Sequence, residues 1–385
     1  MQDAMQERTC ELQRRLKDEG IDVAIITDED SIAWFAGFWG YLGVEFGRPT
    51  MLVVPADAAP SVITPLMESD MASAMTWIKD VRPWQDAQGP DHWDQVLADT
   101  VKPMAGLKVG IERLKMPALV SRFVEDTYGA AQLNDVSGVI GDMRMIKSPL
   151  EIGIMRQAGK VAIAMLEGGR ARLGAGVPEY EIALGVIEGG TRKAAGFLTD
   201  AGYEAFISPM VHNLQVLQSG EHTAMVHRRP NVRTLGKGDP IYFCFCGIVN
   251  FKQYKLGFDR EYFIGSVTDE QAKTYETCIA AQEAALAAIR PGAIAEEVHN
   301  AANEVYQSAG FAPGYRTGRA IGISNLESPE LKEGDRTVLR EGMTFAVDGG
   351  ITVPGKYGAR VGDSIVVTKD GYEFFTPYPK DLTVV

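Results

Sequence analysis

The stretch 148–169, SPLEIGIMRQAGKVAIAMLEGG, divides the chain and decides how the rest is organised. Its apolar residues recur at helical spacing, which predicts a long amphipathic helix. Ser148-Pro149 marks the helix start, because proline is tolerated at the first helical position and Glu151 places an acid in the first turn. We therefore expect a first domain over residues 1–142 and a second over 143–385.

Before this helix, short apolar runs alternate with helical stretches. Leu12 and Leu16 lie on one stripe of a predicted helix over 11–19, and a further helix is expected over 116–130. Apolar runs bounded by turn residues predict buried strands at 22–28, 50–55, 61–65 and 107–112. This alternation is typical of an α/β domain.

After the helix that begins at Ser148-Pro149, long helices are separated by strands that favour antiparallel pairing. Helices are predicted over 178–196, 269–290 and 294–310. Strands are predicted at 205–210, 241–249, 260–266, 343–353 and 363–368. The second domain is therefore expected to be α+β.

Composition excludes several classes of partner. The 385 residues include 45% hydrophobic and 23% charged residues, as in an ordinary soluble enzyme. With 38 Lys and Arg against 51 Asp and Glu, the net charge is −13, so neither nucleic acid nor an anionic membrane is an expected partner. No secretory signal and no apolar run long enough to span a membrane is found, which favours a cytoplasmic protein.

The cysteines do not indicate a disulfide framework. Cys10, Cys244, Cys246 and Cys278 are too few and too scattered for one, which fits a reducing compartment. Cys244 and Cys246 are alternate residues of a predicted strand, so they share a face, and buried thiols are favoured over metal ligation.

Six ordered motifs indicate a family. They are MRMIKSPLEIGIMRQAGKVA, VPEYEIAL, HRRPNVRTLGKGD, YKLGFDREYFIG, LREGMTFAVDGG and RVGDSIVVTKDGYEFFT. In this order they resemble the pita-bread-fold family of methionine aminopeptidase, aminopeptidase P, prolidase and creatinase. FGRP at 46–49 and the MRMIKS linker look closest to the metal-free creatinase-like branch.

This chain departs from the family pattern mainly at the positions of the metal ligands. Metal-dependent members hold two divalent ions with two Asp, one His and two Glu. The corresponding positions here are Cys244 or Phe245, Gly257, Arg319, Asp348 and Gly362. One oxygen ligand of five is left and a guanidinium is added, which predicts a site with no metal and no cofactor.

The remaining polar residues suggest another use of the pocket. His227 is similar in position to the proton-carrying His of creatinase-like enzymes, and an imidazole that titrates near neutrality suits that role. Asp259 and Asp348 resemble the carboxylates that bind a cationic substrate there. Tyr254, Arg260 and Arg319 are expected to contact the same substrate. A surface histidine and an ordinary Asp259–Arg260 ion pair are the simpler alternatives.

The resemblance also implies a homodimer. Phe46 and Arg48 are expected to enter the partner subunit's pocket, where Arg48 would hold a substrate carboxylate by two parallel hydrogen bonds. Aromatic packing alone would equally explain the cluster of rings over 34–46.

The predicted function is a metal-independent hydrolase of a non-peptide C–N bond in a small zwitterionic amidine or guanidino compound, as in creatinase or ectoine hydrolase. Two alternatives stay open. One is a metal-dependent Xaa-Pro dipeptidase, aminopeptidase or lyase of the same fold. The other is a non-catalytic binding protein.

Overall fold

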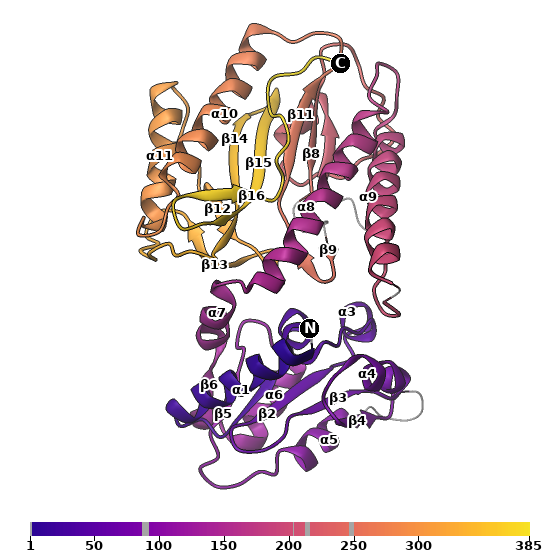
Figure 1. The fold of residues 1–385 in the computed structure, drawn as a ribbon, viewed down its shortest axis with the longest axis vertical. Helices are drawn as coiled ribbons and strands as arrows, with labels where there is room; N and C mark the ends of the chain where they lie inside the picture. Colours follow the sequence, from indigo (N-terminus) through magenta and orange to yellow (C-terminus); the bar gives the residue numbers. More distant parts are fainter. Residues whose placement is uncertain (1, 87–91, 203, 212–215, 246–249) are drawn as a thin grey trace. The chain divides into compact units, whose positions relative to one another are not determined.

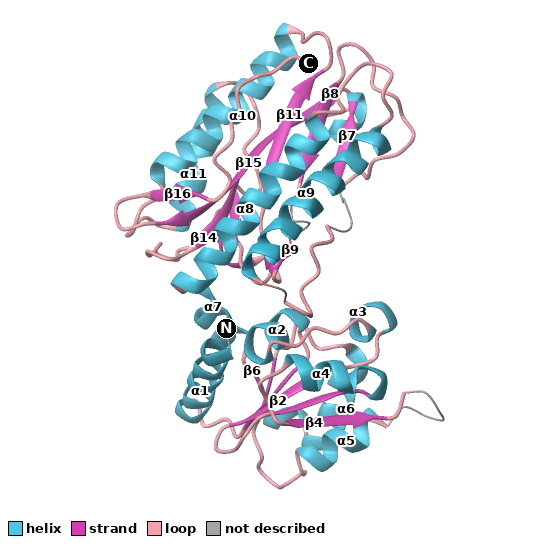
Figure 2. Ribbon diagram, turned by 45° about the vertical axis from the view of Figure 1, so that its right-hand side comes forward, coloured by secondary structure: helices cyan, strands magenta, loops and turns pink. Residues whose placement is uncertain are grey.

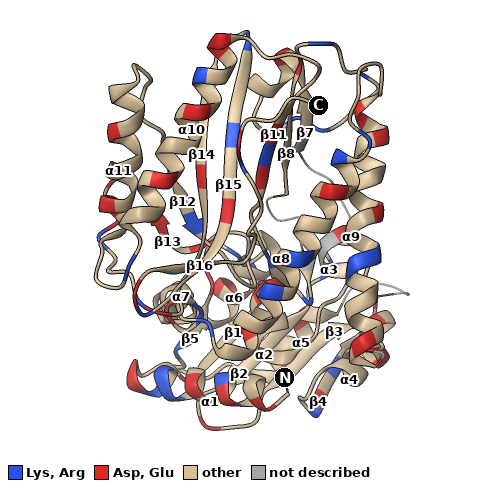
Figure 3. Ribbon diagram, turned by 45° about the horizontal axis from the view of Figure 1, so that its top comes forward, with Lys and Arg blue, Asp and Glu red and all other residues tan. Residues whose placement is uncertain are grey.

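The computed structural model describes residues 2–86, 92–202, 204–211, 216–245 and 250–385. The chain divides into two compact units, residues 1–143 and 144–385. Figure 1 shows each as a sheet with helices on it, the first in indigo to purple and the second in magenta to yellow. Figure 3 shows acidic and basic residues interspersed along α1 (Gln2–Asp18). None of the helices in the described ranges is long and apolar enough to cross a membrane.

The first unit is built on a six-stranded mixed sheet of order β4-β3-β2-β1-β5-β6. Its buried core is rich in Val and Ile from the strands, with Trp84 and Trp93 among the largest side chains. The strands are β1 (Val23–Ile26), β2 (Met51–Pro55), β3 (Ser61–Pro65), β4 (Asp80–Trp84), β5 (Val109–Ile111) and β6 (Leu133–Asp135). The helices are α1 (Gln2–Asp18), α2 (Glu29–Ala36), α3 (Leu42–Phe46), α4 (Ser69–Met75), α5 (Trp93–Thr100) and α6 (Ala118–Tyr128), with 3₁₀ turns η1 (Leu66–Glu68) and η2 (Ala130–Gln132).

Helix α7 (Ser137–Met145) crosses the boundary between the units, and α8 (Pro149–Arg170) follows it. The predicted start of α8 is confirmed. Ser148 caps the helix, its side chain accepting from the backbone N–H of Glu151 while the Glu151 carboxylate accepts from the backbone N–H of Ser148. This reciprocal pairing satisfies amide groups that the first helical turn cannot satisfy itself.

The second unit contains a strongly curved eight-stranded sheet of order β13-β12-β14-β15-β11-β8-β7, with β16 paired to β15 (Figure 2). Its strands are β7 (Val216–Ser219), β8 (Pro240–Cys244), β11 (Asp259–Phe263), β12 (Gly318–Ala320), β13 (Glu327–Leu331), β14 (Thr344–Val353), β15 (Tyr357–Val367) and β16 (Tyr372–Phe374). A separate hairpin pairs β9 (Asn250–Phe251) with β10 (Tyr254–Lys255). The other helices are α9 (Glu179–Ala201), α10 (Asp269–Ala288) and α11 (Ala295–Ser308), with the 3₁₀ turn η3 (Gly220–Ala224).

Helices α8 and α10 cover one face of this sheet. A Cβ on Gly169 of α8 would lie 2.7 Å from the Phe243 ring, and a Cβ on Gly349 would lie 2.3 Å from the Cys278 carbonyl of α10. Residues next in sequence point to the opposite face, because side chains alternate along a strand. Helices α8 and α10 do not cover that opposite face, so it can hold a binding site.

The fold class is confirmed as an α/β first unit followed by an α+β second unit. The strand predicted at 205–210 is wrong. Those residues form turns and loop, where the Ser208 hydroxyl accepts the backbone N–H of Met210 and Pro209 removes a ladder donor. The predicted strand 241–249 is observed as far as Cys244, and residues 246–249, including Cys246, lie outside the described residues.

Candidate active site

A cavity of about 550 Å³ opens on the face of the second sheet that α8 and α10 leave uncovered. It brings together four residues singled out from the sequence, His227, Asp259, Arg319 and Asp348. Its walls also include Tyr242, Cys244, Tyr306, Phe311, Pro313, Tyr315, Arg316, Asn325, Leu326, Thr352 and Arg360. All of these belong to the second unit.

The floor of the cavity is a row of paired residues across four strands. Asp259 on β11 is the partner of Cys244 on β8 and of Gly362 on β15, and Gly362 is the partner of Asp348 on β14. Residues paired across strands share a face and have close Cβ positions. The register therefore aims both carboxylates at one place.

Gly362 separates the two carboxylates. A Cβ at this position would stand 2.7 Å from Asp259 Oδ2 and 2.7 Å from Asp348 Oδ1. Within the described part of the chain, Asp348 Oδ1 is buried and has no hydrogen-bond partner. The glycine thus leaves a gap bounded by two carboxylate oxygens, an arrangement suited to one small cationic group.

Arg319 forms an ion pair with Asp348 beside this gap. Its Nη1 lies 3.1 Å from Asp348 Oδ2, while Nε donates to the Asn325 carbonyl and Nη2 to Asn325 Oδ1. Arg319 stands where the resemblance places the ligand histidine of metal-dependent members, and the sequence predicts that it contacts the substrate. The structure pairs it with Asp348.

His227 lines the rim of the cavity and is exposed. The loop around it is held by Glu179, a fully buried carboxylate in the first turn of α9. Glu179 accepts from Arg228 Nη1 at 3.3 Å, from the Asn231 backbone N–H at 3.0 Å and from the Ser219 hydroxyl at 2.7 Å. The position of the imidazole thus depends on an anchor distant in sequence.

Two predicted substrate contacts lie outside the cavity lining. Arg260 follows Asp259 along the strand and points to the opposite face, where its Nη2 donates to Asp363 Oδ1 at 2.8 Å. The simpler alternative of an Asp259–Arg260 side-chain pair is therefore not what the structure shows. The Tyr254 hydroxyl donates to Glu151 Oε1 at 2.9 Å, tying β10 to the start of α8. Both arrangements are structural.

Phe46 and Arg48 belong to the first unit. The Phe46 side chain is 62% exposed and packs edge-on against Tyr41. Arg48 Nη1 lies 3.0 Å from the buried Asp86 carboxylate while the Arg48 side chain is one-third exposed. An exposed guanidinium anchored on a buried acid is suited to presenting charge at a surface.

Sequence reasoning missed Glu261 and Asn325. Glu261 shares its strand face with Asp259, is fully buried, and accepts the Arg360 backbone N–H at 2.9 Å. Burial raises the pKa of Glu261 to about 8. The period-2 spacing from Asp259 was the available signal for Glu261. No sequence signal links Asn325 to Arg319.

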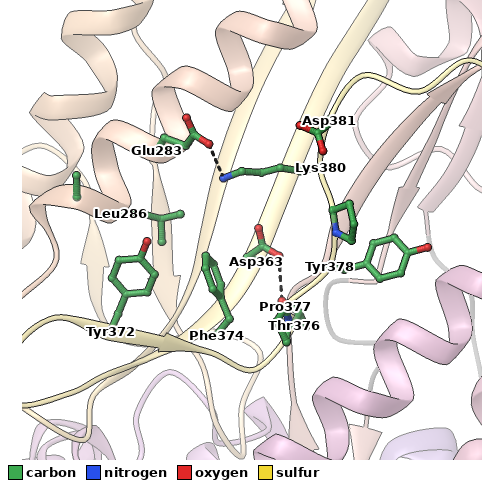
Figure 4. Close-up of a pocket in the computed structure, with 12 residues that line it drawn as sticks. Glu283, Leu286, Asp363, Tyr372, Phe374, Thr376, Pro377, Tyr378, Lys380 and Asp381 are labelled. Carbon is green, nitrogen blue, oxygen red and sulfur yellow. Dashed lines mark hydrogen bonds and ion pairs between the residues drawn. The ribbon is translucent and has the colours of Figure 1, made fainter.

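A second cavity of about 510 Å³ lies on the opposite side of the sheet, between α10 and the chain after β16 (Figure 4). Lys380 extends toward Glu283 at 3.4 Å, and the Thr376 hydroxyl donates to the buried Asp363 at 3.1 Å. Burial raises the pKa of Asp363, against the opposing effect of Arg260. This cavity was not predicted, since its walls combine α10, the motif at 360–376 and the chain at 377–381, which are brought together only by the fold.

The residues present do not fit a dinuclear metal centre of the five-ligand type. In the described chain, no group of three or more His, Cys, Asp and Glu side chains could hold a metal ion. Gly257 and Gly362 supply no donor, and a glutamate at 362 would meet the Asp259 and Asp348 carboxylates already at its Cβ. No reaction step is therefore assigned to a metal.

The curved sheet, the packed helices α8 with α9 and α10 with α11, and the cavity on the open face define a pita-bread-type domain. Residues 153–369 match the metallopeptidase family M24, and residues 8–146 match the creatinase/prolidase N-terminal domain. The chain belongs to the M24 family.

Similar proteins bear the names of two different activities. The chain is 30% identical to an agropine synthesis cyclase of Rhizobium rhizogenes, over 95% of this chain and 94% of that protein. It is also 30% identical to a Xaa-Pro dipeptidase of Lactobacillus helveticus, over 97% of this chain and 98% of that protein.

Solved structures share the whole fold. The dipeptidase PepE from Mycobacterium ulcerans is 27% identical with a TM-score of 0.81, covering 100% of this chain and 98% of that one. An X-Pro aminopeptidase from Thermotoga maritima is 22% identical with a TM-score of 0.82, covering 98% and 99%.

These comparisons correct the predicted function. The metal-independent hydrolase of a non-peptide C–N bond, an amidinohydrolase of the creatinase-like branch, is wrong, because relatives and solved neighbours carry dipeptidase, prolidase and aminopeptidase names within a metallopeptidase family. The physical reason is that a pair of carboxylates binds an α-ammonium as readily as an amidinium. Pocket charge alone did not identify the bond that is cut.

Proposed function

We propose that this chain is a hydrolase of small peptides with a free amino end, of the Xaa-Pro dipeptide class. The observation that supports this most directly is the single cavity in which His227, Asp259 and Asp348 meet, in a chain 30% identical to a Xaa-Pro dipeptidase. A volume of about 550 Å³ accommodates a dipeptide.

In this proposal the ammonium of the substrate lies in the gap above Gly362, between Asp259 and Asp348. His227 takes a proton from the water that attacks the peptide carbonyl carbon. It then gives that proton to the departing nitrogen as the C–N bond breaks, so the imidazole ends neutral. The products are two amino acids.

The finer assembly is also a proposal. We propose a homodimer in which Phe46 and Arg48 of one copy complete the cavity of the other, supported by the exposure of both side chains and the anchoring of Arg48 on Asp86. A cytoplasmic location is supported by Cys10 and Cys278, which form no disulfide.

The test is turnover of a dipeptide panel by the purified chain, followed by chromatography and mass spectrometry of the released amino acids. Ala-Pro, Gly-Pro and Leu-Pro are compared with their N-acetylated forms, each with added Mn²⁺ and with a chelator. We expect cleavage of free dipeptides and at least a tenfold loss on acetylation, since the ammonium is removed. No cleavage under any condition would refute the proposal.

A second candidate is a ring-closing reaction on a small amino compound. It is favoured by the 30% identity to a protein named a cyclase, together with donor positions that do not fit the five-ligand centre. The same mass spectrometry separates the candidates, because hydrolysis adds one water to the substrate and ring closure removes one.

A further inference from the structure

Arg319 is a feature of this chain that the proposed reaction does not yet use. We propose that Arg319 is a positioning residue, which holds Asp348 by Oδ2 so that Oδ1 faces the gap above Gly362 and binds the substrate's ammonium. That the bound group is a substrate ammonium rests on the proposed function. The contacts of Arg319 with Asp348 and Asn325 do not.

The first support is the directionality of the contacts. The Arg319 side chain is 95% buried. Its guanidinium contacts Asp348 Oδ2 at 3.1 Å, the Asn325 carbonyl at 2.9 Å and Asn325 Oδ1 at 3.3 Å. A guanidinium is planar and rigid, so fixing two of its edges on Asn325 fixes the third. The Asp348 carboxylate is thereby held in one orientation.

The second support is that this orientation of the Asp348 carboxylate leaves Oδ1 facing the gap. Asp348 Oδ1 is buried, has no hydrogen-bond partner in the described structure, and lies 2.7 Å from where a Gly362 Cβ would be. A buried oxygen without a donor is costly unless a ligand supplies one. Without Arg319 the carboxylate could rotate toward solvent and lose this alignment.

The third support is charge. Asp259, Asp348 and Arg319 together carry one net negative charge, which a single ammonium neutralises. A second negative charge left unbalanced beside the first would repel it, because like charges at close range disfavour each other. With Arg319 in place the gap is matched to a monocation.

Other cavity arginines do not share this role. Arg316 pairs with Glu330 at 2.6 Å, and Arg360 donates to the Ile351 carbonyl and the Thr352 hydroxyl. Arg316→Ala therefore breaks a carboxylate pair at the same cavity without touching Asp348. It is the matched control for effects of added guanidinium.

The kinetic experiment measures Ala-Pro hydrolysis by Arg319→Ala with and without millimolar methylguanidinium. We expect KM to rise about 10- to 100-fold with a smaller change in kcat, and methylguanidinium to recover at least a third of the loss. Arg316→Ala should show no recovery. In an Asp348→Asn background, Arg319→Ala should add less than a twofold further change, because the two residues act as one unit.

A second measurement needs no substrate. Millimolar methylguanidinium should raise the Tm of Arg319→Ala, by filling the space between Asp348 and Asn325, and should leave wild type, Arg316→Ala and the Arg319→Ala/Asp348→Asn double variant unchanged. Equal shifts in all four proteins, or none in Arg319→Ala, would overturn the inference. If Ala-Pro is not cleaved but the selective Tm shift appears, the proposed function fails while the positioning of Asp348 stands.

Discussion

Gly362 shows how one missing side chain can create a site. Its neighbours in the row, Asp259 and Asp348, both reach toward the volume that a Cβ would occupy. Because glycine has no Cβ, that volume stays open, and the two carboxylates border it. The open volume is space for a ligand atom.

Filling that space should abolish recognition. We predict that Gly362→Ala raises KM for a free dipeptide about 10- to 100-fold, because the new methyl group stands 2.7 Å from both carboxylate oxygens and displaces a charge-assisted hydrogen bond. Steady-state kinetics measures this. Gly371→Ala, where a Cβ meets nothing within 4 Å, should behave as wild type. Equal KM values for the two variants would contradict the prediction.

Glu261 gives the protein a pH-dependent stability. Burial raises its pKa from an ordinary 4.5 to about 8, so between these values the folded chain binds one more proton than the unfolded chain, and stability falls as pH rises. Glu261→Gln removes the loss of stability with rising pH, because the amide does not titrate. We predict that the variant's Tm exceeds that of wild type increasingly from pH 5 to 8, measured by scanning calorimetry. A constant difference across this range would show that Glu261 does not titrate there.

At the scale of elements, the first turn of α9 fixes the loop that contains His227. The Glu179 carboxylate joins the helix to Ser219, Arg228 and Asn231. The apolar periodicity over 178–196 predicted a helix here, and the family resemblance of the motif HRRPNVRTLGKGD implied a functional histidine. Neither pattern showed that the two segments are in contact. They are distant in sequence, and only the folded second unit brings them together.

We predict that Glu179→Gln lowers kcat about tenfold or more and shifts the pH profile of hydrolysis, since Arg228 loses its charged partner and the imidazole loses its fixed position. The matched control is Glu181→Gln on the same helix, an exposed acid paired with Arg172 at 3.6 Å, which should stay within twofold of wild type. Circular dichroism checks that both variants fold. Unchanged kcat in folded Glu179→Gln would exclude a positioning role.

At the scale of the whole molecule, the proposal that two copies share each cavity makes a quantitative prediction. Arg48→Ala and Asp348→Asn should each be nearly inactive alone. Mixing them in equal amounts after dissociation should restore about a quarter of wild-type activity, because half of the dimers are mixed and each mixed dimer has one intact site. Sedimentation velocity establishes the dimer. Absence of recovery in confirmed mixed dimers would place both residues in one copy's site.

Local patterns in the sequence predicted the two-part architecture, the start of α8 at Ser148-Pro149, most strands and four polar residues of the cavity, His227, Asp259, Arg319 and Asp348. These follow from local periodicity, capping chemistry and ordered motifs, which act over a few residues. Only the tertiary structure decided that Asp259 and Asp348 converge over Gly362, that Arg260 turns away while Arg319 turns inward, and that Glu179 and Asn325 support them. Strand register and the alternation of faces decide such juxtapositions, and residues distant in sequence carry no local signal of them. The chemistry of the substrate was the least determined, because carboxylates specify charge and not the bond beside it.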